Sequence, residues 1–188
     1  MGGVAYGRGK QALIDAAITI VATQGLRGLT YRAVAAEAGV TQGLVRHHFG
    51  DWNSLLEAAL EHAVSRSLEF SGLETSGPGL EGLSSAMIEF ISGEEEIQAF
   101  QYELVLEARR RPELAPVLER VYESYRSAVQ RELARNGIDD PGLTWAVFAA
   151  IDGLIFQLIA FRDTAATARA FDALRSLLML YSAGRATS

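Results

Sequence analysis

Residues 41–48, TQGLVRHH, combine polar side chains in a pattern suited to binding a nucleic acid. If this segment is helical, Leu44 and Val45 turn toward the core and the polar residues remain outside. The candidate DNA-binding residues on or beside this helix are Thr41, Gln42, Gly43, Arg46, His47 and His48. Amide, guanidinium and imidazole groups bond base edges and phosphates, and Gly43 lets the backbone approach closely. The chemistry that this pattern indicates is non-covalent recognition of DNA.

A tight turn between two short helices must position these side chains. The first helix has apolar residues at helical spacing, and the Thr30 hydroxyl can accept a hydrogen bond from a free backbone N–H at its start. Gly39 can end this helix in the left-handed conformation, and Thr41 can cap the second helix. Residues 30–50 therefore predict a helix-turn-helix. The alternative is an ordinary helical hairpin with a solvated polar face, which is common in all-α proteins.

The first third of the chain resembles the DNA-binding domain of TetR-family transcriptional regulators. The similarity runs from Lys10 to Leu60 and includes ALIDAAITIVATQGLRGLT, the AxxAGVTxG turn at 35–43 and VRHHFGDWNSLL at 45–56. This resemblance implies a homodimer that binds a palindromic double-stranded DNA operator. It also implies a repressor that a small-molecule effector releases, although the sequence does not distinguish a repressor from an activator.

The resemblance further implies an all-α fold with two domains. Residues 1–50 are expected to form an N-terminal three-helix helix-turn-helix DNA-binding domain. Residues 51–188 are expected to form a C-terminal helical ligand-binding and dimerisation domain, with 51–70 as a linking helix. Turn-forming residues at 71–79 mark a boundary inside that second domain. Further helices are predicted near 80–92, 94–110, 113–135, 141–162 and 165–183.

Two positions depart from the family pattern. Arg46 stands where the family usually has a tyrosine that contacts the phosphate backbone, and arginine can make that contact with a full charge. Trp52 stands where a lysine usually contacts phosphate, so one charged contact is lost, although the indole N–H can donate to a phosphate oxygen. We also expect Thr30, Tyr31 and Arg32 to contact the phosphate backbone.

Charge and composition fit a DNA-binding head on an acidic body. The net charge is −6, yet residues 1–50 hold five Lys and Arg against two acidic residues, giving +3, and residues 51–188 give −9. A positive head can follow phosphates while an acidic body stays away from the duplex, although so few charges can also divide this way by chance. With 49% apolar residues the chain can bury a sizeable core, and without cysteine it forms no disulfide. No export signal is recognisable, which predicts a cytoplasmic protein.

The longest apolar run, from Leu143 to Phe161, has the length of a membrane helix. Asp152 lies at its centre and neither flank is basic, so burial in hydrocarbon would be costly and no membrane partner is expected. A helix buried inside an oligomer explains the run better, and by resemblance the last two helices pair with those of a second copy. The predicted dimer contacts are Ala146, Ala149, Ala150, Gly153, Phe171, Leu174, Leu178 and Tyr181. The alternative is that these helices pack only on their own chain.

Aromatic residues in the middle helices are candidates for a ligand pocket. By resemblance such helices enclose an effector, and the scarcity of charge in residues 143–161 favours a largely apolar one with a few polar anchors. The candidate residues are Phe100, Glu103, Glu107, Tyr122, Tyr125, Trp145, Phe148 and Phe156. Aromatic residues at helical spacing more often form plain core, and charged residues on such helices are more often solvated.

No catalytic, cofactor or metal site is predicted. The chain has no glycine-rich phosphate loop, and His47 and His48 point about 100° apart on a helix, so they make a poor metal pair. The run from Glu94 to Glu96 is typical of a solvated helix start, which the positive end of a helix favours. The main alternative to a regulator is a helical protein-interaction module without sequence-specific DNA binding. Such a module has no reason to carry the polar outer face of residues 41–48.

Overall fold

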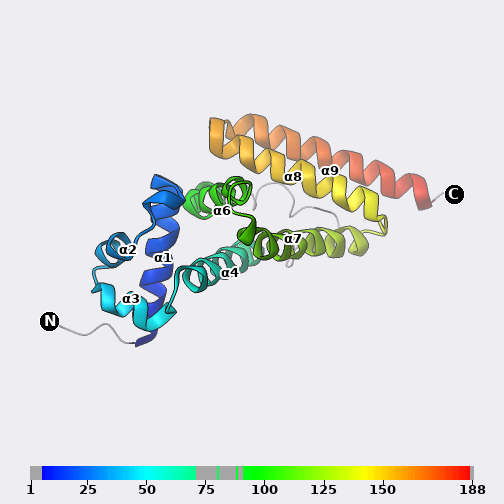
Figure 1. Cartoon of the computed structure of the whole chain (residues 1–188). Helices are drawn as coiled ribbons and strands as arrows, with labels where there is room; N and C mark the ends of the chain where they lie inside the picture. The colour runs from blue at the N-terminus through cyan, green and yellow to red at the C-terminus, as the bar shows by residue number, and fades with distance from the viewer. Residues whose placement is uncertain (1–5, 71–79, 81–87, 89–90, 187–188) are drawn as a thin grey trace. The chain divides into compact units, whose positions relative to one another are not determined.

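The computed structural model describes residues 6–70, 80, 88 and 91–186, and this part of the chain is helical without a strand (Figure 1). The all-α prediction is therefore confirmed. The helices are α1 (Tyr6–Gln24), α2 (Tyr31–Glu37), α3 (Gln42–Phe49), α4 (Trp52–Phe70), α6 (Glu95–Ala108), α7 (Ala115–Arg135), α8 (Pro141–Phe161) and α9 (Thr164–Ala186), with short 3-10 turns at Leu26–Gly28 and Pro112–Leu114. Four helices predicted after residue 93 lie within a few residues of α6 to α9. The helix predicted at 80–92 falls largely outside the described residues.

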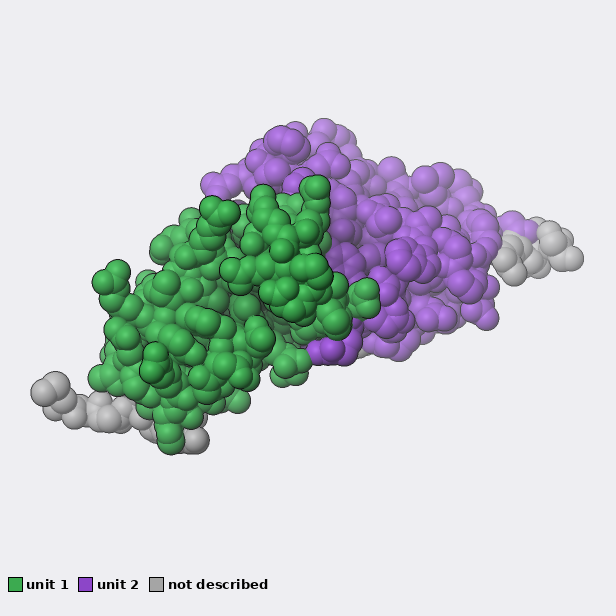
Figure 2. All heavy atoms as spheres, in the orientation of Figure 1, with its two compact units in different colours: residues 1–64, 96–119 green, residues 65–95, 120–188 purple. Residues whose placement is uncertain are grey.

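The chain folds into two compact units, coloured separately in Figure 2. The first unit comprises residues 1–64 and 96–119, and the second comprises residues 65–95 and 120–188. The domain predicted at 1–50 falls inside the first unit, which also contains the first part of α4 and nearly all of α6. The domain boundary at residue 50 stays a prediction.

The first unit is built on α1, whose apolar residues repeat at helical spacing. Leu13 and Val21 on α1 are fully buried, as are Val34 on α2, Val45 on α3 and Leu55 on α4. Each helix thus contributes apolar side chains to one core, which supplies most of the free energy that holds such short helices in place. The result is a fixed platform for the residues that α2 and α3 expose.

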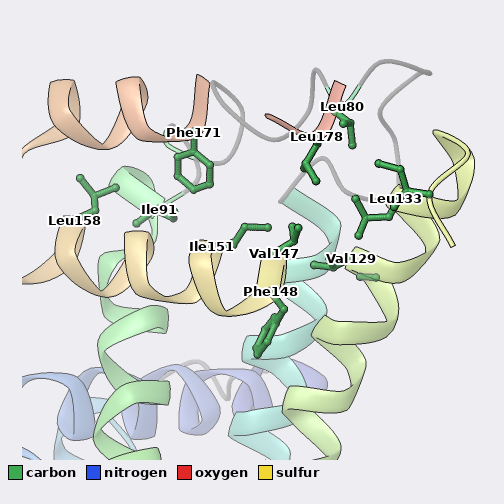
Figure 3. Packing of buried hydrophobic residues seen from close by; sticks show 12 residues of the cluster. Leu80, Ile91, Val129, Leu133, Val147, Phe148, Ile151, Leu158, Phe171 and Leu178 are labelled. Carbon is green, nitrogen blue, oxygen red and sulfur yellow. The ribbon is translucent and has the colours of Figure 1, made fainter. Parts of the chain in front are cut away.

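The second unit has its core between α7, α8 and α9 (Figure 3). The hydrophobic cluster there contains Val129 and Leu133 from α7, Val147, Phe148, Ile151 and Leu158 from α8, and Phe171 and Leu178 from α9. Phe171 is 0% exposed and Leu178 is 2% exposed. These two side chains, predicted as dimer contacts, therefore pack within their own chain. Apolar residues lie on both sides of α9, and helical spacing alone does not reveal which side meets α8.

The start of α8 is held by residues from both neighbouring elements. Asp140 caps the helix because its Oδ1 accepts from the Leu143 backbone N–H at 3.0 Å. The other carboxylate oxygen accepts from the Tyr181 hydroxyl at 3.1 Å, and the Ser182 hydroxyl donates to the Asn136 carbonyl at 2.9 Å. The last turns of α9 are thereby bonded to the turn between α7 and α8.

The acidic run at the start of α6 is not simply solvated, which corrects the expectation from its sequence. Glu94 pairs with Arg66, and Glu95 accepts from the Arg162 guanidinium at 3.1 Å. Glu96 Oε2 accepts from the Thr19 hydroxyl at 2.7 Å. Three consecutive carboxylates therefore have three partners on different elements. These partners lie far apart in the sequence, so a local charge pattern could not identify them.

Candidate nucleic-acid interface

The helix-turn-helix begins at a capped α2. The Thr30 Oγ1 accepts a hydrogen bond from the Ala33 backbone N–H at 3.1 Å, as the sequence predicts. Gly39 has a φ of 65°, the left-handed conformation in which a residue with a Cβ is strained. Thr41 occupies the cap position of α3, but its side chain makes no capping hydrogen bond. The Thr41 hydroxyl is exposed on the surface that carries the other candidate residues.

The second helix of the helix-turn-helix, α3, has a buried side and an exposed polar side. Val45 and Phe49 are buried, and Leu44 is partly covered. The exposed residues are Gln42, Gly43, Arg46 and His47. A Cβ added at Gly43 would meet no atom nearer than the Thr41 hydroxyl, at 3.8 Å, so the backbone there is open to a ligand. The outward face is therefore the one that the sequence predicts.

His48 differs from its neighbours because it turns toward α1. The residue is only partly exposed, and Gly9 on α1 is buried. A Cβ placed on Gly9 would lie 3.6 Å from His48 Nε2, so the imidazole packs close to the α1 backbone. His48 is thus less available to a base than His47. Its position still borders the exposed polar face.

Tyr31, Arg46 and Trp52 meet at the edge of this face. The Tyr31 and Trp52 rings stack with centroids 4.4 Å apart and an interplanar angle of 20°. The Arg46 guanidinium carbon lies 5.0 Å from the Tyr31 ring centroid. The Tyr31 hydroxyl donates to the Gly50 carbonyl at 3.1 Å. The side chains of Tyr31 and Trp52, both predicted as phosphate contacts, are therefore already engaged with the protein, while Arg32 is exposed.

Asp51, beside Trp52, caps α4 and keeps a negative charge at the surface. The Ser54 backbone N–H donates to Asp51 Oδ1 at 2.9 Å. Hydrogen bonds from the Ser54 backbone and hydroxyl lower the pKa of Asp51 below its ordinary value. The carboxylate is fully exposed and ionised at neutral pH. Any attraction for phosphate must therefore come from cationic side chains on the same unit.

Comparison with known protein families shows which family this chain belongs to. The family of bacterial regulatory proteins of the tetR type matches residues 13–59, and the Tetracyclin repressor-like C-terminal domain matches residues 78–180. The chain belongs to the TetR family. Regulators of this family bind DNA, generally respond to small-molecule ligands and act as dimers, and the family is not one of enzymes. The resemblance found in the sequence is thereby confirmed.

Two curated relatives match about a quarter of this chain. The chain is 42% identical to the HTH-type transcriptional regulator BetI of Paraburkholderia xenovorans over 52 residues, which is 28% of this chain and 27% of the relative. It is 40% identical to BetI of Proteus mirabilis over 53 residues, 28% of this chain and 26% of the relative. The match thus spans about a quarter of these relatives.

Solved structures match nearly the whole chain. A regulator assigned to the family from Rhodococcus sp. has a TM-score of 0.78 at 24% identity, over 92% of this chain and 99% of that one, and supports the fold. A family member from Streptomyces coelicolor has a TM-score of 0.74 at 29% identity, over 90% of this chain and 97% of that one. The multidrug binding protein EbrR complexed with proflavin has a TM-score of 0.61 at 29% identity, over 90% and 99%.

One cation near the TetR-type recognition helix is missing from the sequence prediction. Lys10 on α1 is exposed, and its Nζ lies 5.7 Å from the centroid of the Phe49 ring at the end of α3. A lysine so placed can reach a phosphate beside the recognition helix. In the sequence, the indication of a role for Lys10 is that it contributes to the positive charge of residues 1–50. Only the packing of α1 across α3 shows that this charge stands near the interface.

The predicted effector residues are divided between the two units of this TetR-family chain. Phe100, Glu103 and Glu107 lie in the first unit, where Phe100 is fully buried and Glu107 pairs with two arginines. The other five lie in the second unit, namely Tyr122, Tyr125, Trp145, Phe148 and Phe156. Within the second unit the structure brings Tyr122 and Phe148 into contact.

The aromatic cluster of the second unit, defined here as Tyr122, Trp145 and Phe148, has polar groups at its edges. The Tyr122 and Phe148 rings meet edge to face with centroids 5.5 Å apart. The Arg126 guanidinium lies 4.4 Å from the Trp145 ring centroid and 5.9 Å from that of Phe148. Burial, with smaller effects of Asp152 and Tyr125, raises the pKa of Tyr122 to about 12, so its hydroxyl stays neutral. Phe156 is 47% exposed.

A shallow hollow in the same unit lies at the end of α8, between Ile91, Leu158 and Ile159, with the Arg162 and Glu95 ion pair at its rim. Its cavity volume of about 30 Å³ has room for no more than a few water molecules. In the part of the chain that the structure describes, no group of three or more His, Asp or Glu residues could hold a metal ion.

The faces of α8 and α9 that do not meet each other remain apolar. Ala146 and Ala149 are exposed, whereas Ala150, Gly153 and Leu174 are partly covered. The large exposed apolar residues on these helices are Trp145, Phe156, Phe161, Leu177, Met179, Leu180 and Tyr181. Among the described helices, α8 is long and apolar enough to cross a membrane, a test that core helices of soluble proteins also pass. In its apolar window, 28% of the residues are buried in this chain.

Proposed function

We propose that this TetR-family regulator is a repressor that binds a palindromic operator as a dimer and is released by a small, largely apolar effector. The observation that carries the proposal is the exposed polar face of α3, where Gln42, Arg46 and His47 stand on a helix fixed by its buried side. We assign residues 1–50 to DNA binding. Residues 51–188 then bind effector and form the dimer, with α4 between the two.

A dimer supplies what one recognition helix lacks. An eight-residue helix reaches few base edges, whereas two copies related by two-fold symmetry read both halves of a palindrome. Half-sites separated by one helical turn, about 34–36 Å, or a multiple of it fit such a dimer. A monomer that binds non-specifically would show no such preferred spacing.

The second copy is also the partner that best covers the apolar faces of α8 and α9. A membrane is a poorer partner because Asp152 lies in the middle of α8, where hydrocarbon would penalise its charge. Helices of α-helical dimers bury such faces against a second copy, and small residues such as Ala146 and Ala149 let the helices approach closely. We therefore place the regulator in the cytoplasm, as a DNA-binding dimer.

Selection of bound duplexes from a random pool tests this function. We expect a palindrome to be enriched, and titration of that duplex at two salt concentrations to show steep salt dependence because lysines and arginines displace counterions. Enrichment of a single half-site would show that the protein does not require a palindromic operator. A folded, dimeric protein that enriches no sequence would instead support the helical protein-interaction module.

The aromatic cluster of the second unit is the best candidate for effector contact. Aromatic faces with few polar groups suit a largely apolar ligand. The neighbour EbrR is described in complexes with proflavin and with ethidium, which are planar aromatic cations, so this comparison supports the aromatic part of the proposal and not the lack of charge. The Tyr122 hydroxyl and the Arg126 guanidinium are the polar groups that could orient such a ligand.

A thermal-unfolding screen of small aromatic molecules checks this site. We expect a binding compound to raise the unfolding temperature, and the Trp145→Ala variant to lose most of that rise because a ring face of the cluster is gone. Trp145 is 58% exposed, so its removal should leave the fold intact. Gln130→Ala, at an exposed position on α7 in the same unit, is the control. A compound that stabilises both variants as much as the wild type would place the effector site elsewhere.

A further inference from the structure

We propose that Trp52 is a positioning residue for DNA binding, which acts by holding Tyr31 and, through it, the guanidinium of Arg46. The inference rests on the proposed role of Arg46 at the phosphate backbone. It joins three residues from three helices of the first unit, because Tyr31 begins α2, Arg46 lies on α3 and Trp52 begins α4. We call these three residues the arginine–aromatic stack.

The contacts of the stack leave Tyr31 little freedom. Its ring is stacked on Trp52 with centroids 4.4 Å apart, and its hydroxyl donates to the Gly50 carbonyl at 3.1 Å. Both rings are partly buried, whereas Arg46 is exposed. The ring under the Arg46 guanidinium is therefore fixed at its face and at its hydroxyl. Tyr31 is accordingly a support for a DNA contact, and its hydroxyl hydrogen is not available to a phosphate.

A fixed ring favours one orientation of the arginine. An aromatic face attracts a guanidinium and stacks with its plane, and the Arg46 guanidinium carbon lies 5.0 Å from the Tyr31 centroid. An exposed arginine without this support loses side-chain freedom when it binds a phosphate, which reduces the affinity. The stack orders the side chain before DNA arrives. Trp52 contributes by keeping the Tyr31 ring in place.

The arrangement divides two roles between positions 46 and 52. The positive charge stands at position 46 on α3, and position 52 carries a ring that supports it. A lysine at position 52 would supply a charge but no face for Tyr31. Arg46 and Trp52 are thus expected to act as a pair.

Operator titration of four variants tests the pair, with the duplex obtained from the selection. We expect Trp52→Ala to weaken binding by about three- to tenfold, the order of an aromatic and a cation–π contact. Trp52→Phe keeps a ring but lacks the indole N–H, and it should stay within about twofold of the wild type because the proposed contact is the ring face. In the Arg46→Ala background, Trp52→Ala should cause little further loss, since the residue acts through Arg46.

Each contrary result has its own meaning. If Trp52→Phe binds as weakly as Trp52→Ala, the indole N–H is the functional group and the positioning role is wrong. Losses that multiply independently in the double variant would also overturn it. A Trp52→Ala variant that binds the operator as well as the wild type would likewise overturn the positioning role. If Arg46→Ala alone binds normally, the proposed role of Arg46 fails and the inference with it, while the selection result shows separately whether the protein reads DNA. Thermal unfolding of every variant identifies losses of binding that arise from misfolding. If Trp52→Ala does not fold, Trp52→Phe still tests whether the ring face or the indole N–H is the functional group.

Discussion

Arg46→Ala is expected to weaken operator binding at least about tenfold, because each copy loses a charge-assisted hydrogen bond to the DNA backbone. Arg46 is exposed and oriented over the Tyr31 ring, 5.0 Å from its centroid. Each lost phosphate contact should reduce the slope of log affinity against log salt by about 0.9, so a dimer should lose about twice that value. Titration at several salt concentrations measures both effects.

Gln42→Ala is the matched control on the same face of α3. The amide of Gln42 is exposed and neutral, so its removal should relax base preference at one position and leave the salt slope unchanged. The two variants therefore separate phosphate contact from base recognition. If both bound every sequence as well as the wild type, α3 would not be the recognition helix.

Leu180→Glu is expected to abolish the dimer and, with it, high-affinity operator binding. Leu180 is 71% exposed and Leu177, one turn away, is 65% exposed, so both side chains lie on the face of α9 that its own chain leaves open. If a second copy covers this face, a glutamate there must be buried without a partner, which costs several kcal/mol in analogous sites, or about a hundredfold or more in dimer affinity. The affinity for the operator should decrease together with the dimer affinity, since one protomer reads only one half-site.

Light scattering at several protein concentrations measures the dimer, and titration of the selected duplex measures binding. Gln130→Glu is the matched control, because it adds the same charge at an exposed position on α7 in the same unit. That variant should remain dimeric. A Leu180→Glu protein that stays dimeric at micromolar concentration would show that this face of α9 is not the interface.

The sequence was sufficient for the elements whose cause is local. Thr30 caps α2 and Gly39 turns the chain in the structure as predicted, because a hydroxyl cap and a left-handed glycine depend on a few neighbouring residues. The polar face of α3 follows equally from helical periodicity. Local pattern alone therefore places most of the candidate DNA-binding residues.

The sequence was insufficient wherever the partner lies far along the chain. Nothing near Trp52 indicates that its ring meets Tyr31, and nothing near Glu96 indicates that it accepts from Thr19. Periodicity also failed on α9, where apolar residues occupy both sides. Phe171 packs against the chain's own core, and Leu180 faces out. Such choices depend on how helices pack, which one-dimensional spacing does not determine.

The hydrogen bonds that join α9 to the turn before α8 can form only after α9 has been synthesised. The chain leaves the ribosome from its N-terminus, so α8 and its Asp140 cap emerge while α9 is still inside. Phe171 and Leu178 have not yet arrived to cover Val147 and Ile151, and Tyr181 has not yet reached Asp140. Among the described helices α8 is the most apolar, and the side that α9 covers in the folded protein therefore stays open until the last turns of α9 are made.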